Sequence, residues 1–186
     1  MKLSIIGIIG SILGFVSLAL PWWTMSFSSA IFGQSFSIDA SVYLYQVTGA
    51  GQSGTLGAEF WYGWVALVLV LVGSILGLLG SVIASKRRKL LAAAGVLALV
   101  GVILFPVAFQ MDMSGALGST GVPSGIGLFS SGSTSDSGTT LNYTTYLTFG
   151  FWIALVGAIL IIVAATRKTP AAAAVTASMP PPPPPD

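Results

Sequence analysis

Residues 61–109 read WYGWVALVLVLVGSILGLLGSVIASKRRKLLAAAGVLALVGVILFPVAF, which is two apolar runs on either side of a short basic turn. A helix needs about 20 mostly apolar residues to cross the hydrocarbon core of a bilayer. Residues 61–84 and 90–109 meet that requirement, and neither run contains Asp, Glu, Lys or Arg. The connection at 85–89 is so short that the two helices should be antiparallel neighbours. We expect Pro106 to kink or end the second helix, because proline lacks an N–H.

Two further uncharged apolar runs, at residues 3–20 and 146–166, lie on either side of this hairpin. The whole chain is 54% hydrophobic and only 6% charged, whereas a soluble domain is about 25% charged. Such a chain cannot cover a water-exposed surface with ionised side chains. The sequence therefore predicts an all-α membrane protein with a four-helix transmembrane bundle. The lipid bilayer is the expected surrounding and partner of that bundle.

The first apolar run has an alternative interpretation as a signal peptide. Lys2 precedes it, and residues 28–30 loosely resemble a small-residue cleavage site. However, the run is longer than a usual signal-peptide core, and Pro21 with the two following tryptophans separates it from the proposed site. A membrane span is the favoured interpretation.

The distribution of charge predicts which end of each span lies at the cytoplasmic side of the membrane. All basic residues fall at one end of the threaded chain: Lys2, Lys86, Arg87, Arg88, Lys89, Arg167 and Lys168. Basic residues mark the cytoplasmic side of a span. Four of the five carboxylates lie in the two loops at the other end, residues 24–60 and 110–145: Asp39, Glu59, Asp112 and Asp136. We expect a multi-pass protein of the cell membrane with both termini in the cytoplasm.

Aromatic and small residues in the spans predict depth and packing. All tryptophans lie near the outer span ends, where amphipathic rings favour the headgroup boundary, and are expected to anchor the protein there: Trp22, Trp23, Trp61, Trp64 and Trp152. Small residues recur on one face of each helix, where they allow close backbone approach. The clearest rows are Gly10 and Gly14; Gly73, Gly77 and Ser81; and Gly150, Ala154 and Ala158. We expect these rows to close the bundle of one chain rather than to form a dedicated oligomer interface.

The outer loops carry strand patterns. Residues 36–47 alternate between apolar and polar side chains, which predicts a half-buried strand in a hairpin with residues 23–28. Residues 49–57 are expected to be a flexible connection. Edge strands are expected at 127–131 and 139–143. Together the two loops should form a small extracytoplasmic β-sheet that rests on the bundle.

The residue types restrict the chemistry. The chain has no Cys and no His, which excludes thiolate nucleophiles, Cys/His zinc sites and imidazole bases. Glu59 and Asp112 are the candidate metal ligands, but a Ca²⁺ site needs six or more oxygen ligands. No catalytic residue, cofactor or nucleic-acid partner is expected. Asn142 begins an Asn-Tyr-Thr pattern that glycosylation enzymes recognise, close to the fourth span.

Residues 169–186 form an Ala- and Pro-rich tail that ends in a proline run from Pro180 to Pro185. Such a composition has no core to join, so the tail is predicted to be disordered in the cytoplasm. A proline run also forms an extended polyproline II rod, which could dock a proline-recognition module.

The layout resembles the claudin-like tetraspans, which have four helices, a larger first outer loop with β character, a short inner turn and a smaller second outer loop. The claudin pair of cysteines in the first loop has no counterpart here, so the resemblance implies topology and not pore or strand formation. The junction Leu20, Pro21, Trp22, Trp23 also resembles that of small four-span membrane proteins of archaea and bacteria.

By elimination, we expect a non-enzymatic membrane protein that acts by assembly, as a scaffold, adhesion element or accessory subunit of an envelope complex. Its partner would be another membrane protein or a further copy of the chain. The alternative is an oligomeric channel or pore for ions or small solutes, lined by Gly, Ser and Thr.

Overall fold

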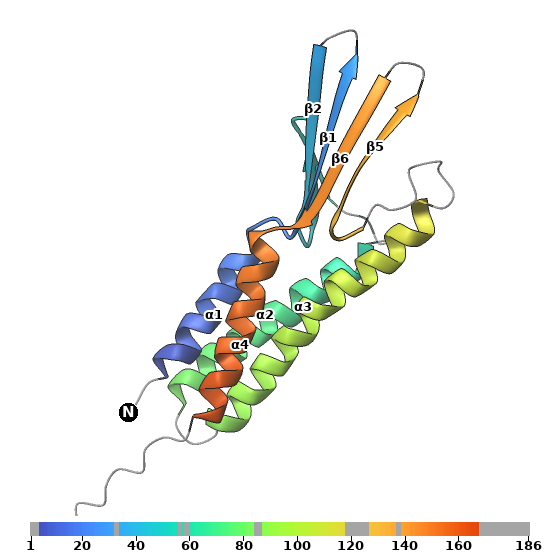
Figure 1. Cartoon of the computed structure of the whole chain (residues 1–186). Helices are drawn as coiled ribbons and strands as arrows, with labels where there is room; N and C mark the ends of the chain where they lie inside the picture. The colour runs from blue at the N-terminus through green and yellow to red at the C-terminus, as the bar shows by residue number, and fades with distance from the viewer. Residues whose placement is uncertain are drawn as a thin grey trace, which may run out of the picture.

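The computed structural model describes residues 4–31, 34–55, 57, 60–83, 87–117, 127–136 and 139–167, and structural statements concern these residues. Helices and strands follow one another in the order α1 (Ile5–Leu18), β1 (Trp23–Ile31), β2 (Gln34–Val42), β3 (Gln46–Gly49), β4 (Gln52–Thr55), α2 (Trp61–Val82), α3 (Arg87–Leu117), β5 (Ser130–Asp136), β6 (Thr139–Leu147) and α4 (Phe149–Thr166). The molecule is a helical bundle with a sheet at one end (Figure 1).

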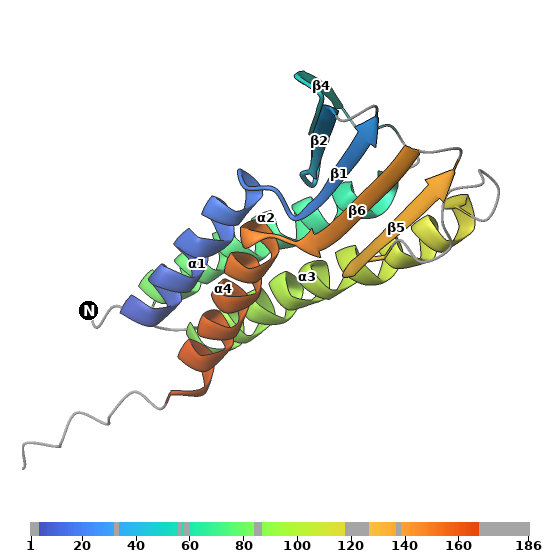
Figure 2. The ribbon, with the colours of Figure 1, turned by 45° about the horizontal axis from the view of Figure 1, so that its top comes forward.

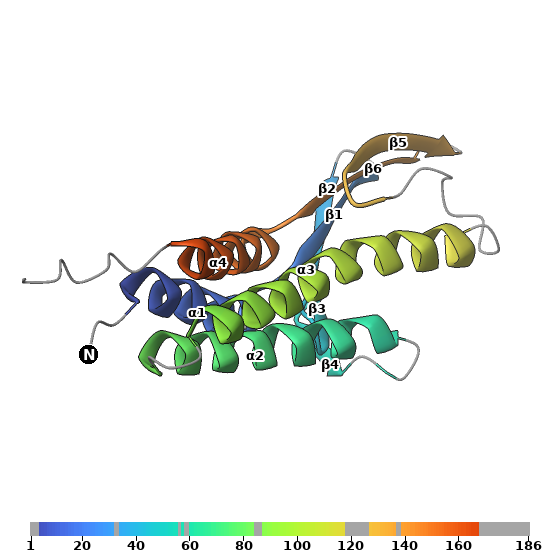
Figure 3. The same cartoon turned by 90° about the horizontal axis from the view of Figure 1, so that it is seen from below.

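The four helices form a closed ring in which α1 contacts α2 and α4, and α3 contacts the same two helices. Figure 3 shows the pairs α1 with α4 and α2 with α3 running side by side. Helix α2, residues 88–112 within α3, and helix α4 are long and apolar enough to cross a membrane. Helix α1 has 14 residues and is about 21 Å long, so it is shorter than the other three.

The sheet has six antiparallel strands in the order β4, β3, β2, β1, β6, β5. The expected combination of four helices with a sheet from both outer loops is present, and the six strands make the protein a mixed helix and sheet structure rather than an all-α one. The alternation of apolar and polar residues gives β1, β2 and β6 a face to bury. Strand β1 follows α1 and β6 leads into α4, so the sheet projects from that end of the bundle (Figures 1 and 2).

Several predicted boundaries are wrong for identifiable reasons. The strand expected over 36–47 ends at Val42, where a tight turn closes with the Tyr43 N–H donating to the Gln46 carbonyl at 2.8 Å. The connection expected at 49–57 contains the β3–β4 hairpin, with positive φ at Ala50 and Gly51. Strand β6 lies inside the sheet rather than at its edge.

Helix α3 continues through Pro106 to Leu117, so the proline does not end the helix near 109, which was one of its two expected effects. A proline inside a helix removes one hydrogen bond and costs about 3 kcal/mol. Packing offsets that cost on both sides of Pro106, because Phe105 and Phe109 are buried in the main core. The helix therefore extends into the region that was assigned to the second loop.

The core centres on the junction between bundle and sheet. The Trp22 ring is 0% exposed, packs at 5.3 Å from the Phe105 ring and 6.1 Å from the Phe151 ring, and donates its Nε1–H to the Ser17 carbonyl at 2.9 Å. Trp23 is also buried, 4.8 Å from the Phe109 ring. Both rings contact protein rather than lipid, which corrects their expected role as membrane-interface anchors.

The same junction joins the two chain segments that enter the sheet. The carbonyl of Pro21 accepts hydrogen bonds from the Gly150 N–H at 3.0 Å and from the Thr148 hydroxyl. The Thr148 N–H donates to the Trp22 carbonyl, also at 3.0 Å. The α1–β1 and β6–α4 connections are therefore held together directly, which fixes the sheet on the bundle.

Candidate interaction surface

The register gives the sheet one apolar face and one polar face, because successive side chains of a strand point to opposite sides. The apolar face carries Trp23, Met25 and Phe27 of β1, Phe36, Ile38 and Val42 of β2, and Leu141, Tyr143 and Leu147 of β6. The polar face carries Thr24, Ser26 and Ser28 of β1, Ser37, Asp39 and Ser41 of β2, and Asn142, Thr144 and Tyr146 of β6.

The apolar face is covered only near the bundle. Met25, Val42, Tyr143 and Leu147 are buried there against the aromatic core. Further out, Phe36 is exposed, whereas Phe27, Ile38 and Leu141 are half-buried and Phe27 packs against the core; we call these four residues the distal apolar patch. Phe36 is 61% exposed, which is high for a large aromatic ring on a sheet.

The polar face is a hydroxyl-rich surface. One row across the sheet runs from Ser131 through Thr144 and Ser26 to Asp39. Asn142 lies on this face with its side chain exposed, between Ser28 and Ser133 in the register. The glycosylation candidate is thus accessible, but it sits within a paired strand rather than in a loop.

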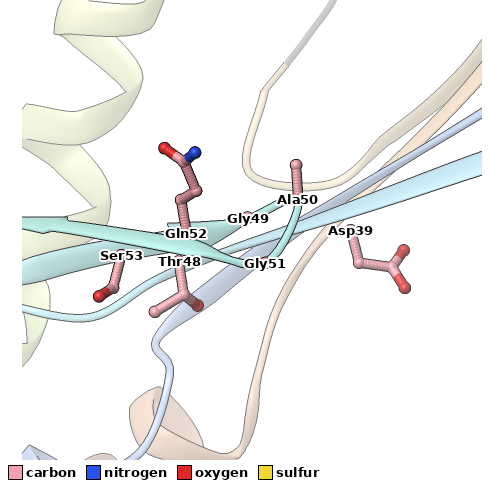
Figure 4. A pocket seen from close by; sticks show the side chains of 7 residues that line it. All are labelled: Asp39, Thr48, Gly49, Ala50, Gly51, Gln52 and Ser53. Atoms are coloured by element: carbon pink, nitrogen blue, oxygen red, sulfur yellow. The ribbon is translucent and has the colours of Figure 1, made fainter.

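The β2 edge of the sheet is stepped. Strand β2 spans residues 34–42, but β3 pairs only with Ala40, Ser41 and Val42. Beyond the Ala50–Gly51 turn, a shallow pocket of about 360 Å³ lies beside Asp39 and the hairpin residues. Figure 4 shows the Asp39 carboxylate past the turn, with Thr48 and Ser53 on the hairpin itself. We call this step, with Ser37 and Asp39 on its β2 side, the β2 notch.

The predicted metal ligands do not form a site among the described residues. Asp112 is exposed, and its Oδ2 accepts a hydrogen bond from the Tyr62 hydroxyl at 3.0 Å. Glu59 lies outside the described residues. Within the described part of the chain, no group of three or more acidic, Cys or His side chains could hold an ion. Sequence reasoning missed the contact with Tyr62, which depends on the unexpected extension of α3.

Small residues of the expected rows lie at the helix contacts of one chain. A Cβ atom added to most of these glycines would meet an atom of a neighbouring helix or connection. Such contacts join Gly7 to Ser81, Gly10 to Gly157, Gly14 to Ser74, Gly77 to Ser11, Gly73 to Ala94 and Ala98, and Gly150 to Pro21. Ala154 and Ala158 are buried.

Between α1 and α2 a glycine of one helix faces a serine of the other three times in succession, a pairing that the sequence rows alone did not indicate. Each of these serines donates its hydroxyl within its own helix: Ser11 to the Gly7 carbonyl at 2.8 Å, Ser74 to the Val70 carbonyl at 2.8 Å and Ser81 to the Gly77 carbonyl at 2.7 Å. Close packing therefore leaves no buried hydroxyl unsatisfied at this contact.

The remaining predicted residues lie at the two ends of the bundle. Trp61, Trp64 and Trp152 are exposed at the sheet end of the helices. Arg88, Lys89 and Arg167 are exposed at the opposite end. Arg87 begins α3 there, whereas Lys86, Lys168 and the prolines from Pro180 to Pro185 lie outside the described residues.

Comparison with known proteins identifies no family for this chain. No protein-family model matches it, and no curated protein matches it.

Proposed function

We propose that this chain is a non-enzymatic, four-span membrane protein that acts by assembly with another protein of the cell envelope. Its topology resembles that of the claudin-like tetraspans. Helix α1 crosses with the other three helices, because it packs against α2 and α4 along its length through Gly7, Gly10 and Gly14. The basic end faces the cytoplasm with both termini, and the sheet faces outward.

The distal apolar patch is the observation that supports an assembly role. Exposed valine and isoleucine side chains on the helices would contact lipid, but the sheet projects beyond the bundle (Figure 1). Ser29, the β1 partner of Phe36, is six residues beyond Trp23, which places Phe36 about 20 Å further along the sheet. With the sheet facing outward as proposed, Phe36 is exposed to water, and apolar surface exposed to water marks a contact site for protein.

The helical bundle offers a protein partner less available contact surface than the sheet does. The small-residue rows are used within one chain, and lipid-exposed faces of apolar helices gain little from association. The buried serines also donate to their own helices, so they do not present hydroxyls to a solute path between α1 and α2. These contacts close the bundle of one chain, so the alternative, an oligomeric channel, would need its path between chains, and the sheet offers the better supported surface for assembly.

Photo-crosslinking from the sheet tests the assembly role. Benzoylphenylalanine at Phe36 should give a discrete adduct in intact cells, and the same residue at Thr144, exposed on the polar face, is the matched control. The adduct identifies the partner. The variant Phe36→Ser, which carries no crosslinker, should then co-purify with less of that partner after mild solubilisation. A monomer without adducts from Phe36, or equal adducts from both positions, would contradict the proposal.

A further inference from the structure

The acceptor pattern at Asn142 lies on an open surface of the sheet. Asn142 is the only asparagine of the chain, and with Tyr143 and Thr144 it forms the pattern that receives an N-linked glycan. All three residues belong to β6, where successive side chains point to opposite faces. Asn142 and Thr144 are exposed on the polar face, whereas Tyr143 is buried on the apolar face. The two side chains that define the pattern are thus available on one surface.

The side chains around Asn142 leave room for a bulky group. In the register, Asn142 lies between Ser28 of β1 and Ser133 of β5, and both serines are exposed. Residues directly opposite one another on paired strands have their Cβ atoms about 4.5–5.5 Å apart, so these serines are the nearest side chains across the strands. Ser37 of β2 continues the same row and is exposed too. A group attached to the Asn142 amide can therefore leave the sheet without displacing a large side chain.

Strand pairing does not conflict with the modification. The hydrogen bonds from β6 to β1 and β5 lie in the sheet, whereas side chains stand roughly perpendicular to it. Strand β6 is also the last of the described strands in chain order, so the pattern emerges as an extended chain before the sheet is complete. A glycan attached at that stage remains outside the sheet, on the polar face, when β6 pairs between β1 and β5.

The polar face also has hydrogen-bonding groups that suit a carbohydrate. Two rows cross the sheet in the register: Ser131, Thr144, Ser26 and Asp39, and beside it Ser133, Asn142, Ser28 and Ser37. Apart from the amide and the carboxylate, every member carries a hydroxyl, which can donate and accept hydrogen bonds as sugar hydroxyls do. A glycan that lies on these rows would replace water at polar groups and cover no apolar side chain of either row.

We propose that Asn142 carries an N-linked glycan, which covers the polar face of the sheet. The donor is an oligosaccharide joined through phosphate to a membrane lipid. The Asn142 amide nitrogen forms a bond to the anomeric carbon of the first sugar. The bond between that carbon and the phosphate oxygen breaks, and the phosphate leaves with the electron pair while the amide releases one proton. The apolar face, with its distal apolar patch, then remains the free protein surface of the sheet. This inference rests on the proposed function, because the sheet must face outward to meet the transferase.

Synthesis of the full-length chain in the presence of microsomes that contain an oligosaccharyltransferase tests the site. The natural chain should gain a single glycan, seen as slower migration on a gel that a peptide N-glycosidase reverses. Asn142→Gln and Thr144→Ala should lose that shift completely, whereas Thr144→Ser should keep it because serine retains the hydroxyl. The glycosidase leaves aspartate at position 142, which peptide mass spectrometry identifies.

Asn142→Gln combined with Ser53→Asn is the matched control. The second change creates an Asn-Gly-Thr pattern with Gly54 and Thr55 in β4, whose residues are exposed at the edge of the same sheet. If this variant is modified and the natural chain is not, the sheet meets the enzyme and the inference about Asn142 is overturned. If neither is modified, the inference is overturned together with the outward orientation of the sheet.

A single thiol measures whether the glycan covers the polar face, because the natural chain contains no Cys. A polymer-linked maleimide should label Ser28→Cys at least about threefold more slowly in the glycosylated protein than after the glycan is removed, since Ser28 lies opposite Asn142. Phe36→Cys, exposed on the apolar face, should react at the same rate in both forms. Equal rates at Ser28→Cys would overturn the covering of the polar face.

The two proposals fail differently. If Asn142 is modified but the crosslinker at Phe36 gives no adduct, the glycan stands and the assembly role loses its support. If Phe36 gives its adduct and only the Ser53→Asn control is modified, the assembly role stands and the glycan is wrong. A crosslinker at Thr144 removes the acceptor pattern, so Ser131, exposed beside it in the register, is the polar-face crosslinking control for the glycosylated protein.

Discussion

A Cβ atom on Gly10 of α1 would lie 2.7 Å from the carbonyl oxygen of Gly157 on α4, and a Cβ on Gly157 would lie 2.8 Å from the carbonyl oxygen of Gly10. The two glycines thus give each other the space that their backbones need. Because a backbone carbonyl cannot rotate away as a side chain can, Gly10→Ala must push the helices apart. We expect it to lower the free energy of unfolding by about 1–3 kcal/mol.

Reversible unfolding in mixed detergent micelles, followed by circular dichroism, measures that change. Gly157→Ala should have a similar effect, and the double variant should cost less than the two changes added, because one separation of the helices relieves both contacts. Ile159→Ala, exposed on α4, is the control and should change stability much less. Additive effects would show that the two glycines do not share a contact.

The hydrogen bond from Tyr62 to Asp112 should hold the extended end of α3 against α2. Tyr62 is buried next to Phe60, Phe105 and Phe109, so Tyr62→Phe keeps the packing and removes only the hydroxyl. We expect a loss of about 1 kcal/mol. Amide hydrogen exchange should become faster around Asp112 while the apolar part of α3 before Pro106 stays protected. Unchanged exchange there would mean that other contacts hold the helix end.

Sequence patterns predicted those features whose cause is local. The apolar runs at 61–84 and 90–109 predicted α2 and the apolar part of α3, and alternation predicted the pairing of β1 with β2. The sequence around Pro106 wrongly suggested that the helix ends there. The free-energy cost of the proline is visible in the local sequence, whereas the packing of Phe105 and Phe109 that offsets it involves distant segments. The ring of Trp22 suits a lipid boundary and a protein core equally well, so only the fold decides between them.

The candidate surface was harder to predict for the same reason. Phe36 belongs to a regular alternation that predicts burial, and it is exposed because the bundle covers only the near half of the sheet. The β2 notch depends on the different lengths of β2 and β3, and the turn after Val42 contains neither Gly nor Pro to mark it. Relative strand lengths are a property of the assembled sheet and leave no local signal.

Replacing Ala50 should stabilise the turn between β3 and β4. Its φ of 50° lies in the left-handed region, which costs an ordinary side chain about 1–2 kcal/mol but suits Asn or Gly. Ala50→Asn should slow hydrogen exchange in residues 46–55, and Ala50→Val should accelerate it. Ser53→Asn, an exposed change in β4 of the same hairpin, should do neither. Equal effects of Asn at both positions would contradict the explanation by backbone strain.

Membrane topology can be tested with single cysteines. A membrane-impermeant maleimide added to sealed cells should label Ser133→Cys on exposed β5, but should label Arg88→Cys only after permeabilisation. Lys2→Cys should behave like Arg88→Cys if the short helix α1 crosses the membrane. Labelling of Lys2→Cys in sealed cells would show that α1 does not cross, and the protein would then have three spans.

The tryptophans should divide into two groups that differ in what they stabilise. Trp22 is completely buried and hydrogen-bonded, so Trp22→Ala should lower the free energy of unfolding by about 3–5 kcal/mol, and Trp22→Phe by less because most of the ring packing remains. Trp61 is 56% exposed at the sheet end of α2, so Trp61→Ala should change that free energy little. It should instead alter the depth of α2 in the bilayer, measured by quenching with brominated lipids of a single tryptophan left at position 64. A large loss of stability in Trp61→Ala, with no change in quenching, would mean that this ring also contributes to the fold rather than to placement in the membrane.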